Sequence, residues 1–362
     1  MKIKPKGRKI YRYKTRFERL KGFLRDTRAI SLTVLGTGVF VFVGYSIGAP
    51  VMDFLKKQEI LVPTSIAETD TSSVTESTVP TEEPTQPPVQ EHSRLCGYYL
   101  DKSALSTKQT LEDTLSAVPE GITHVIVPLK AEGGRLYYAT RLADAGMCGA
   151  VIAATPLETI YTVIAEKGYI PVASVNALED SVYPHTYAEA AYKIADSTEK
   201  WLDDAPENGG KPRLSPFSEL TLDYLANLTD EIVQTGFTVI LCEGLMFPDF
   251  TAEELQTLDT RVSSADRSSA LADVVNAMKN AAGNAAFYVS VDGDALLKGK
   301  AELMDAAELI SVTGIVVSAD AQTAQQKQKI QNLLSEFSCV LQLEGEGDAQ
   351  SAAIDGSYIL RP

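Results

Sequence analysis

The sequence predicts an α/β protein whose main part is a (β/α)₈ barrel, preceded by a single transmembrane helix and a disordered stalk. Three observations support this prediction. An apolar run of 24 residues without a formal charge follows a strongly basic N-terminus, a segment rich in Ser, Thr, Pro and Glu comes next, and from residue 95 onward strand-like runs alternate with helix-like ones. The length of 362 residues suits one large domain with appendages, or two domains.

The N-terminal 52 residues have the pattern of a membrane anchor. Residues 1–28 hold twelve basic and two acidic residues, and residues 29–52 hold none of either kind. As a helix, 24 residues extend about 36 Å, which exceeds the roughly 30 Å of a bilayer core. Because basic residues stay on the cytoplasmic side, we expect residues 1–28 to be a cytoplasmic tail and the rest of the chain to lie outside. The predicted location is the cell membrane, with a single pass through the lipid bilayer at residues 29–52.

Two alternatives to an anchor are a cleaved signal peptide and a buried core helix. A signal peptide has a shorter apolar region and a cleavage site with small residues, whereas Pro50 follows Ala49 where cleavage would fit best. A buried helix rarely has so basic a flank. The sequence therefore favours an uncleaved anchor.

Residues 53–94 form the predicted stalk, and residues 95–362 form the barrel. The stalk has no apolar periodicity, so it cannot bury enough surface to offset its chain entropy. The domain has 18 basic residues against 38 acidic ones, a net charge of −20. With a sequence pI of about 4.8, the chain is a poor match for nucleic acid, which needs a basic face.

About eight strands alternate with helices in the predicted domain. The predicted strands are Leu95–Leu100, Thr123–Leu129, Ile170–Val175, Phe237–Cys242, Ala286–Val291, Gly314–Ser318, Ser338–Leu343 and Ser357–Leu360. The predicted helices are Thr107–Val118, Leu157–Lys167, Pro216–Thr235, Ser268–Ala281 and Ala324–Phe337. Such alternation favours a parallel barrel. The alternative is a doubly wound open sheet, which would normally carry a glycine-rich turn after its first strand.

Metal and cofactor chemistry have little support in the sequence. The three histidines are dispersed, and no clustered His/Cys spacing indicates a metal site. We expect no cofactor. The four cysteines are better explained as buried thiols than as disulfides, because Cys96, Cys242 and Cys339 lie within or at the end of strand-like runs.

Acidic residues follow several predicted strands, at the end of a barrel where active sites form. Glu132, Asp180, Glu243 and Asp292 each come shortly after an apolar run. Two facing carboxylates can act as the acid and the nucleophile or base of glycoside hydrolysis. Glu243 is the best single candidate, because it follows an uninterrupted apolar run and begins a loop.

Aromatic side chains near strands could serve as sugar platforms. Tyr98, Tyr99, Tyr137 and Tyr138 are the candidates, and their alternative role is strand packing.

The predicted domain contains the segments VIVPLKAEGGRLYYAT (Val125–Thr140), KGYIPVASVNALED (Lys167–Asp180) and GFTVILCEGLMFPDF (Gly236–Phe250). These three segments resemble the glycoside-hydrolase-like barrel family of bacterial envelope proteins. In the same order, that family has I-D-V-K-D before a glycine turn and a tyrosine strand, then G-Y-x-x-I-A-R-I-x-x-F-x-D, and then G-F-D-E-I-Q-F-D-Y-V-R-F-P. A later V-S-x-D resembles Val289–Asp292.

The resemblance implies a site, and the departures from it weaken that site. Catalytic carboxylates would be Glu243 with Asp292 or Asp180, and substrate-binding residues would be Lys130, Glu132, Tyr99 and Tyr138. The departures are Ala131 for an acid, Ser174 and Met246 for arginines, Glu243 for an aspartate and Gly244 for a tyrosine. Methionine cannot supply the bidentate donor of an arginine.

Two functions from different classes are therefore expected. In the first, a membrane-anchored extracytoplasmic enzyme acts on, or binds, a cell-envelope polysaccharide. In the second, a catalytically inactive barrel binds a surface protein or glycan as a scaffold. Two carboxylates about 5–10 Å apart in one cleft would favour hydrolysis, and a cleft filled by Leu245 and Met246 would exclude it. A membrane-tethered sensor is a weaker third possibility. The sequence predicts no oligomeric state.

Overall fold

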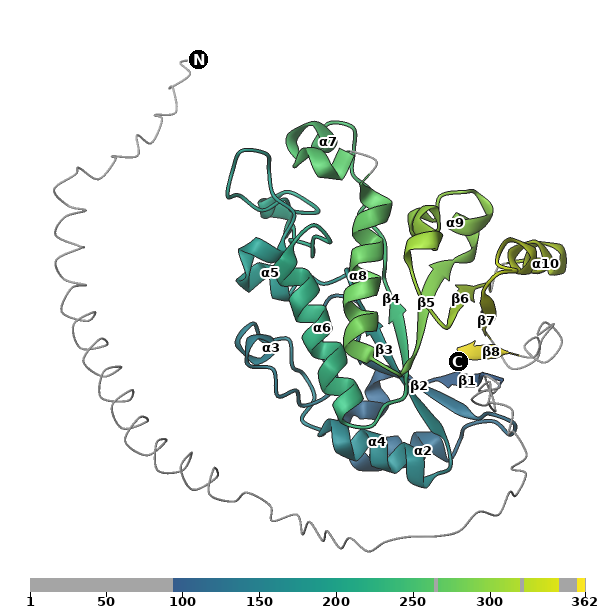
Figure 1. Cartoon of the computed structure of the whole chain (residues 1–362). Coiled ribbons are helices and arrows are strands. Elements are labelled where there is room, and N and C mark those ends of the chain that lie inside the picture. The colour runs from purple at the N-terminus through teal and green to yellow at the C-terminus, as the bar shows by residue number, and fades with distance from the viewer. Residues whose placement is uncertain (1–93, 264–265, 320–321, 345–356, 362) are drawn as a thin grey trace, which may run out of the picture. The chain divides into compact units, whose positions relative to one another are not determined.

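The domain is a closed barrel of eight parallel strands, seen here in a computed structural model that describes residues 94–263, 266–319, 322–344 and 357–361 (Figure 1). Each strand pairs with the next, and β8 pairs with β1. The strands are β1 (Cys96–Tyr99), β2 (His124–Lys130), β3 (Ile170–Asn176), β4 (Val239–Glu243), β5 (Ala286–Asp292), β6 (Gly314–Ser318), β7 (Ser338–Glu344) and β8 (Tyr358–Arg361). The predicted barrel is thus confirmed, and the open sheet is excluded.

The predicted tail, the predicted transmembrane helix and nearly all of the predicted stalk lie outside the described residues. No helix within the described ranges is both long and apolar enough to cross a membrane.

Helices and short 3₁₀ turns lie in the connections between the strands. They are η1 (Lys102–Ser106), α2 (Lys108–Leu115), α3 (Ala143–Met147), α4 (Leu157–Glu166), α5 (Tyr183–Thr186), η2 (Ala188–Ala190), η3 (Pro206–Asn208), α6 (Glu219–Gln234), α7 (Glu254–Thr257), η4 (Thr260–Ser263), α8 (Arg267–Ala282), α9 (Gly293–Leu297), η5 (Glu302–Leu309) and α10 (Ala324–Leu333). In Figure 1, α6 and α8 lie side by side along one flank of the barrel, and α2 and α4 pack together nearby.

Local sequence explains where several of these helices begin and which face they bury. Thr107 and Thr323 each start a helix through a capping box, in which the threonine hydroxyl accepts a backbone N–H three residues on. On α6, Leu225, Leu228 and Ile232 recur at helical spacing, and all three are buried against the barrel.

Side chains along each strand alternate between two cores. Ile126, Leu241 and Val316 belong to the small core inside the barrel. Their neighbours Val127 and Ile240 belong to the larger core between the strands and the helices. A period of two is expected of strands covered on both faces. At the carboxyl ends of the strands, the inward positions of this alternation therefore form the floor of whatever site the barrel holds.

None of the four cysteines, all of which lie within the described residues, forms a disulfide. Cys96, Cys242 and Cys339 are buried and Cys148 is half-buried. This agrees with the expectation of buried thiols for the three that lie on strands.

Candidate active site

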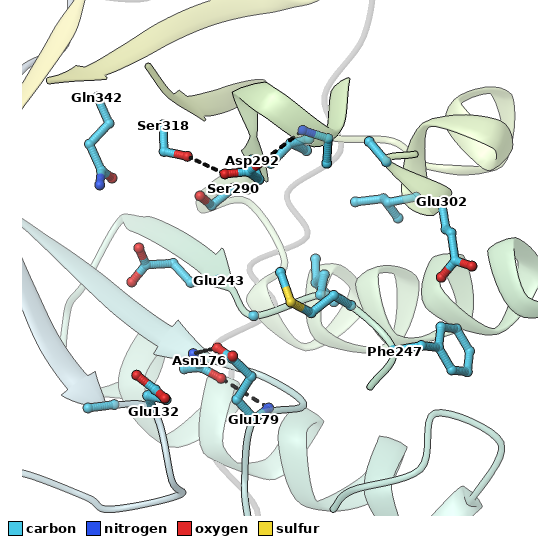
Figure 2. Close-up of a pocket in the computed structure, with 18 of the residues that line it drawn as sticks. Glu132, Asn176, Glu179, Glu243, Phe247, Ser290, Asp292, Glu302, Ser318 and Gln342 are labelled. Atoms are coloured by element: carbon cyan, nitrogen blue, oxygen red, sulfur yellow. Dashed lines mark hydrogen bonds between the residues drawn. The ribbon is translucent and has the colours of Figure 1, made fainter. Parts of the chain in front are cut away.

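A cavity of about 1000 Å³ opens at the carboxyl ends of the strands (Figure 2). Its floor consists of side chains at inward positions of the strands, namely Tyr99, Pro128, Asn176, Glu243, Ser290, Asp292, Ser318, Gln342 and Arg361. Leu245 and Met246 line this cavity without filling it. The cleft is therefore open to a ligand.

Glu243, the last residue of β4, is held by two hydroxyl groups. The Tyr99 hydroxyl donates to Glu243 Oε2 at 2.6 Å, and the Ser174 hydroxyl donates to the same oxygen. The Tyr99 and Ser174 hydroxyls are themselves 2.9 Å apart. No described residue donates a hydrogen bond to Oε1, so one oxygen orients the half-buried side chain and the other remains available for a ligand.

Tyr99 is a buried residue with a positioning role in this group. Burial, followed by the charge of Glu243, raises the pKa of the Tyr99 phenol well above its ordinary value. The phenol therefore stays protonated and donates its hydrogen bond throughout the physiological range. The guanidinium of Arg361 lies 4.6 Å from the centre of the Tyr99 ring, in cation–π contact.

Asp292, the last residue of β5, also lines the cavity, but both of its carboxylate oxygens have partners. Oδ1 accepts the backbone N–H of Ala295 at 2.7 Å, which makes Asp292 the N-cap of α9. Oδ2 accepts a longer hydrogen bond of 3.4 Å from the Ser318 hydroxyl, as Figure 2 shows. The side chain is exposed, so it serves the helix and faces the cleft at once.

The side of the cavity opposite Asp292 in Figure 2 contains Glu132, Asn176 and Glu179. The Asn176 amide donates to Glu179 Oε2 at 2.6 Å and accepts the Glu179 N–H at 3.2 Å. Gly244 adopts a φ of +65°, and a Cβ built there would overlap the Asn176 side chain. A glycine at the position where the family has tyrosine therefore leaves room for this amide.

Lys130 and Asp180 do not reach the cavity. They form a 3.0 Å ion pair in which the two side chains are 1% and 0% exposed. Lys130 Nζ also donates to the carbonyl oxygen of Asn176 at 2.7 Å. Asp180 Oδ1 accepts the backbone N–H groups of Val182 and Tyr183. The pair thus joins the ends of β2 and β3 from the outside, and no part of it is open to a substrate.

A β-bulge explains why Lys130 faces away from the cavity. The register pairs Pro128 with Ser174 but Lys130 with Val175, so two residues of β2 advance against one residue of β3. Pro128 lines the cavity, and simple alternation would put Lys130 there too. The bulge instead places it in phase with Val175, which belongs to the outer core.

Tyr138 is also outside the cavity. It is fully buried, and its hydroxyl donates to Glu231 Oε2 on α6 at 2.9 Å. Glu231 accepts further hydrogen bonds from the Thr140 hydroxyl at 2.5 Å and the Arg141 N–H at 2.6 Å. Of the seven candidates from the sequence, the structure therefore brings together Tyr99, Glu132, Glu243 and Asp292, and it separates Lys130, Tyr138 and Asp180 from them. The catalytic and binding roles proposed for all seven residues stay predictions.

Gln342 and Arg361, from β7 and β8, are floor residues that sequence reasoning missed. Gln342 is only 2% exposed, and its Oε1 has no hydrogen-bond partner. A buried polar atom without a partner is costly, and a ligand in the cavity could supply one. Alternation counted along β7, which puts Val340 inside the barrel and Gln342 two residues later, is the signal that could have found it.

The charge of the lining is mostly negative. Acidic residues in it are Asp101, Glu132, Glu179, Glu243, Asp249, Asp292, Glu302 and Asp305, and basic residues are Lys102, Arg267, Lys300 and Arg361. A polyanionic ligand is therefore disfavoured. No group of three or more His, Cys, Asp or Glu residues suited to a metal ion occurs within the described ranges.

Comparison with known proteins places the chain in a family. The family model described as "Putative glycosyl hydrolase domain" matches residues 97–301, more than half of the chain. The chain belongs to this family. The match extends from β1 beyond β5, so β6, β7 and β8, which carry Ser318, Gln342 and Arg361, lie after its end. No curated protein sequence matches the chain.

Three solved structures that resemble part of the chain have TM-scores below 0.5. A hypothetical protein from Ruminiclostridium thermocellum has 15% identity and a TM-score of 0.46, covering 53% of this chain and 96% of its own. A family 20 β-N-acetylglucosaminidase has 13% identity and a TM-score of 0.43, with coverages of 69% and 52%. The α-L-fucosidase isoenzyme 2 from Paenibacillus thiaminolyticus has 11% identity and a TM-score of 0.47, with coverages of 74% and 46%. The chain thus spans about half the length of these two enzymes.

Proposed function

We propose that this glycosyl hydrolase-family barrel binds a glycan in the cavity and hydrolyses it, with Glu243 and Asp292 as the two carboxylates. The observation that carries the proposal is the placement of Glu243. Its Oε2 is held by Tyr99 and Ser174 at the floor of an open cleft, and no described residue occupies its Oε1. A carboxylate fixed in this way is suited to proton transfer or nucleophilic attack at a glycosidic bond.

The test is hydrolysis by matched single-atom variants. We expect Glu243→Gln to lower the release of reducing ends from cell-envelope polysaccharide by about 10²- to 10⁴-fold, the usual contribution of an acid or base. Glu166→Gln is the matched control. This exposed residue is the last of α4 and precedes the amino end of β3, whereas the cavity lies at the carboxyl end. Unchanged release by Glu243→Gln would remove Glu243 from the mechanism.

A second candidate function is glycan binding without hydrolysis. It is favoured by Asp292, both of whose carboxylate oxygens already accept hydrogen bonds within the domain. The same assay separates the two functions. A binding module would retain polysaccharide and release no reducing ends, and Asp292→Asn would then affect the stability of α9 more than any turnover.

The cellular setting is also a proposal. It is supported by the twelve basic residues of 1–28, the uncharged run 29–52 and the Ser/Thr/Pro/Glu-rich segment after it. We propose that these place the barrel outside the cell membrane, facing an envelope glycan. Protease added to cells that lack their wall but keep an intact membrane should then degrade the barrel. Protection of the barrel until the membrane is lysed would contradict this orientation.

A further inference from the structure

A second cavity of about 910 Å³ adjoins the first. The two share Glu179, Met246, Phe247 and Asp249 in their linings. Figure 2 shows two of these shared residues, Glu179 and Phe247, on the side of the first cavity away from Gln342. The remaining walls of the second cavity come from Leu178, from residues 194–213, between β3 and α6, and from residues 248–257, after β4.

Aromatic contacts between buried Trp201, buried Tyr192 and half-buried Phe250 join these two wall segments. The ring centres of Trp201 and Phe250 lie 4.8 Å apart, and those of Tyr192 and Phe250 lie 5.3 Å apart. The Trp201 indole also donates to Glu254 Oε1 at 2.8 Å. Trp201 is only 6% exposed, so the single tryptophan of the chain builds the wall of the second cavity rather than an open sugar platform.

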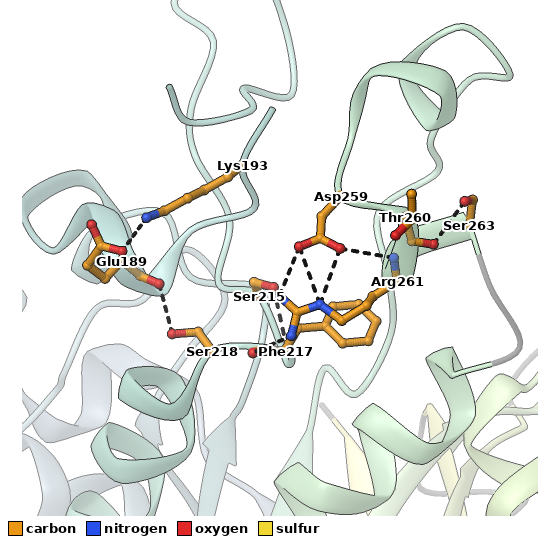
Figure 3. A network of polar contacts seen from close by, with 9 residues as sticks. All are labelled: Glu189, Lys193, Ser215, Phe217, Ser218, Asp259, Thr260, Arg261 and Ser263. Carbon is orange, nitrogen blue, oxygen red and sulfur yellow. Dashed lines mark hydrogen bonds and ion pairs between the residues drawn. The ribbon is translucent and has the colours of Figure 1, made fainter. Parts of the chain in front are cut away.

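Polar contacts join residues that flank these two segments in the chain (Figure 3). The Ser218 hydroxyl donates to the Glu189 carbonyl oxygen at 2.8 Å. Arg261 pairs with Asp259 at 2.9 Å, donates to the Phe217 carbonyl oxygen at 3.4 Å and lies over the Phe217 ring at 5.2 Å. The second cavity is therefore formed before any ligand arrives, which lowers the entropic cost of binding.

We propose that the two cavities form one groove that takes an internal stretch of a polysaccharide chain, with the second cavity holding sugars beyond the one at Glu243. This inference rests on the proposed function. Pockets that enclose a drug-sized ligand have volumes of about 300–1,000 Å³. The volume of each cavity alone lies near the upper end of this range. Together they exceed what a single terminal sugar requires, so the shape suits a chain of several residues.

The shared wall offers a contact for a chain that passes from one cavity to the other. Met246 lines both cavities, and its side chain is 51% exposed. A flexible, polarisable thioether at this position can pack against the apolar face of a sugar ring. Met246, which stands where the family motif has an arginine, therefore supplies an uncharged surface between the two halves of the groove.

The second cavity has the polar character that a hydroxyl-rich ligand needs. Arg213 and Asp203 in its lining form a half-buried ion pair of 3.4 Å. Lys200 donates to the His185 carbonyl oxygen at 2.9 Å, and Glu199 is exposed. Sugar hydroxyls both donate and accept hydrogen bonds, so they can be bound by such a mixture of donors and acceptors.

The test measures how affinity depends on chain length. Isothermal titration of the full chain in detergent would use oligosaccharides of two, four and eight sugars in three series, built from glucose, N-acetylglucosamine and glucosamine. Every protein in the comparison would carry Glu243→Gln, so that no ligand is hydrolysed during the titration. In a series that binds, we expect the eight-sugar ligand to bind at least about tenfold more tightly than the two-sugar ligand, which is about 1.4 kcal/mol.

Two neighbouring substitutions locate the effect. Glu199 lines the second cavity, whereas Thr198 is exposed and does not line it. We expect Glu199→Trp to obstruct the cavity and bring the ratio of long-chain to short-chain affinity towards one. Thr198→Trp, the matched control, should keep the ratio of the unmodified chain.

The outcomes distinguish this inference from the function on which it rests. Equal affinity for two and eight sugars would overturn the groove and leave a single-sugar site at Glu243. A length-dependent affinity that Glu199→Trp and Thr198→Trp both preserve would also overturn the role of the second cavity. Failure of all three series to bind at any length would instead contradict the proposed glycan-binding function.

Discussion

The hydroxyl of Tyr99, at the end of β1, donates a 2.6 Å hydrogen bond to Glu243 Oε2, at the end of β4. These strands are not neighbours in the barrel, so the bond crosses its interior. We expect Tyr99→Phe to lower kcat about ten- to hundredfold, because a hydrogen bond to a charged group contributes roughly 1.5–3 kcal/mol. KM should change little.

Kinetics of Tyr99→Phe on envelope polysaccharide would check this prediction. Ser174→Ala, which removes the other donor to Oε2, should lower kcat in the same direction. Full turnover by both variants, with an intact fold, would show that neither hydroxyl positions the carboxylate.

The buried ion pair of Lys130 and Asp180 should be a structural element. Lys130→Met leaves a fully buried carboxylate without its cation, so the free energy of unfolding should fall by about 3–5 kcal/mol. Adding Asp180→Asn removes that unpaired charge, and the double variant should recover part of the loss. Lys108→Met, at an exposed pair with Glu112, is the control and should cost less than about 1 kcal/mol.

Chemical denaturation followed by the fluorescence of Trp201, the only tryptophan, would measure these changes. Equal stability of Lys130→Met and the unmodified chain would contradict the structural role.

A side chain at Gly244 should lower stability for two reasons, the positive φ of the backbone and a clash with Asn176. A matched pair of variants can separate the two effects. Gly244 and Gly299 both have a φ of +65°, but only at Gly244 would a Cβ meet another side chain, that of Asn176. Gly299→Ala should cost about 1 kcal/mol, the backbone effect alone. Gly244→Ala should cost about 1–3 kcal/mol more, because the buried Asn176 amide must move.

Denaturation midpoints of the two variants would provide the comparison. Equal losses would mean that Asn176 moves without cost, and that the contact with Gly244 does not fix this wall of the cavity.

Gln342 should increase the affinity for a ligand while contributing nothing to the stability of the free domain. Its buried Oε1 has no partner, so Gln342→Met, which nearly conserves volume, should leave the free energy of unfolding unchanged or raise it. Affinity for a bound oligosaccharide should fall about tenfold, since a sugar hydroxyl would lose its partner. Gln322 also has an unpartnered Oε1 but does not line the cavity, so Gln322→Met is the control for binding.

Calorimetric titration alongside unfolding would test both halves of this prediction. A Gln342→Met variant that binds as tightly as the unmodified chain would exclude the amide from ligand recognition.

His124 should make the domain less stable in mild acid. Burial lowers the pKa of this imidazole below its ordinary value of 6.5, so the unfolded chain binds the proton more readily than the folded one. Its contribution to stability is complete above about pH 6.5 and is lost as the pH falls from there towards the lower folded-state pKa, by at most about 1.4 kcal/mol per pH unit for one proton.

His124→Asn should reduce the difference in unfolding free energy between pH 7.5 and pH 5.5, as measured by denaturation. The same substitution at exposed His185 is the matched control. An undiminished pH dependence in His124→Asn would assign the acid sensitivity to other groups.

The sequence by itself determined the barrel and the place of Glu243 at the end of a strand. Each strand is a short apolar run that is buried on both faces, and this pattern is local, so it can be read from one segment at a time. The predicted strand at 314–318 has the same bounds as β6, and Glu243, predicted to begin a loop, is the last residue of β4.

Only the tertiary structure decided which other side chains share the cavity with Glu243. A single bulge at Pro128–Lys130 changes the face on which Lys130 lies, and Asp180 forms a buried ion pair with Lys130 on that face. Tyr138 is similarly drawn outward by Glu231, 93 residues later in the chain. The second cavity depends on rings from two distant segments. These outcomes follow from contacts between residues far apart in the sequence, and no local pattern of apolar and polar residues specifies them.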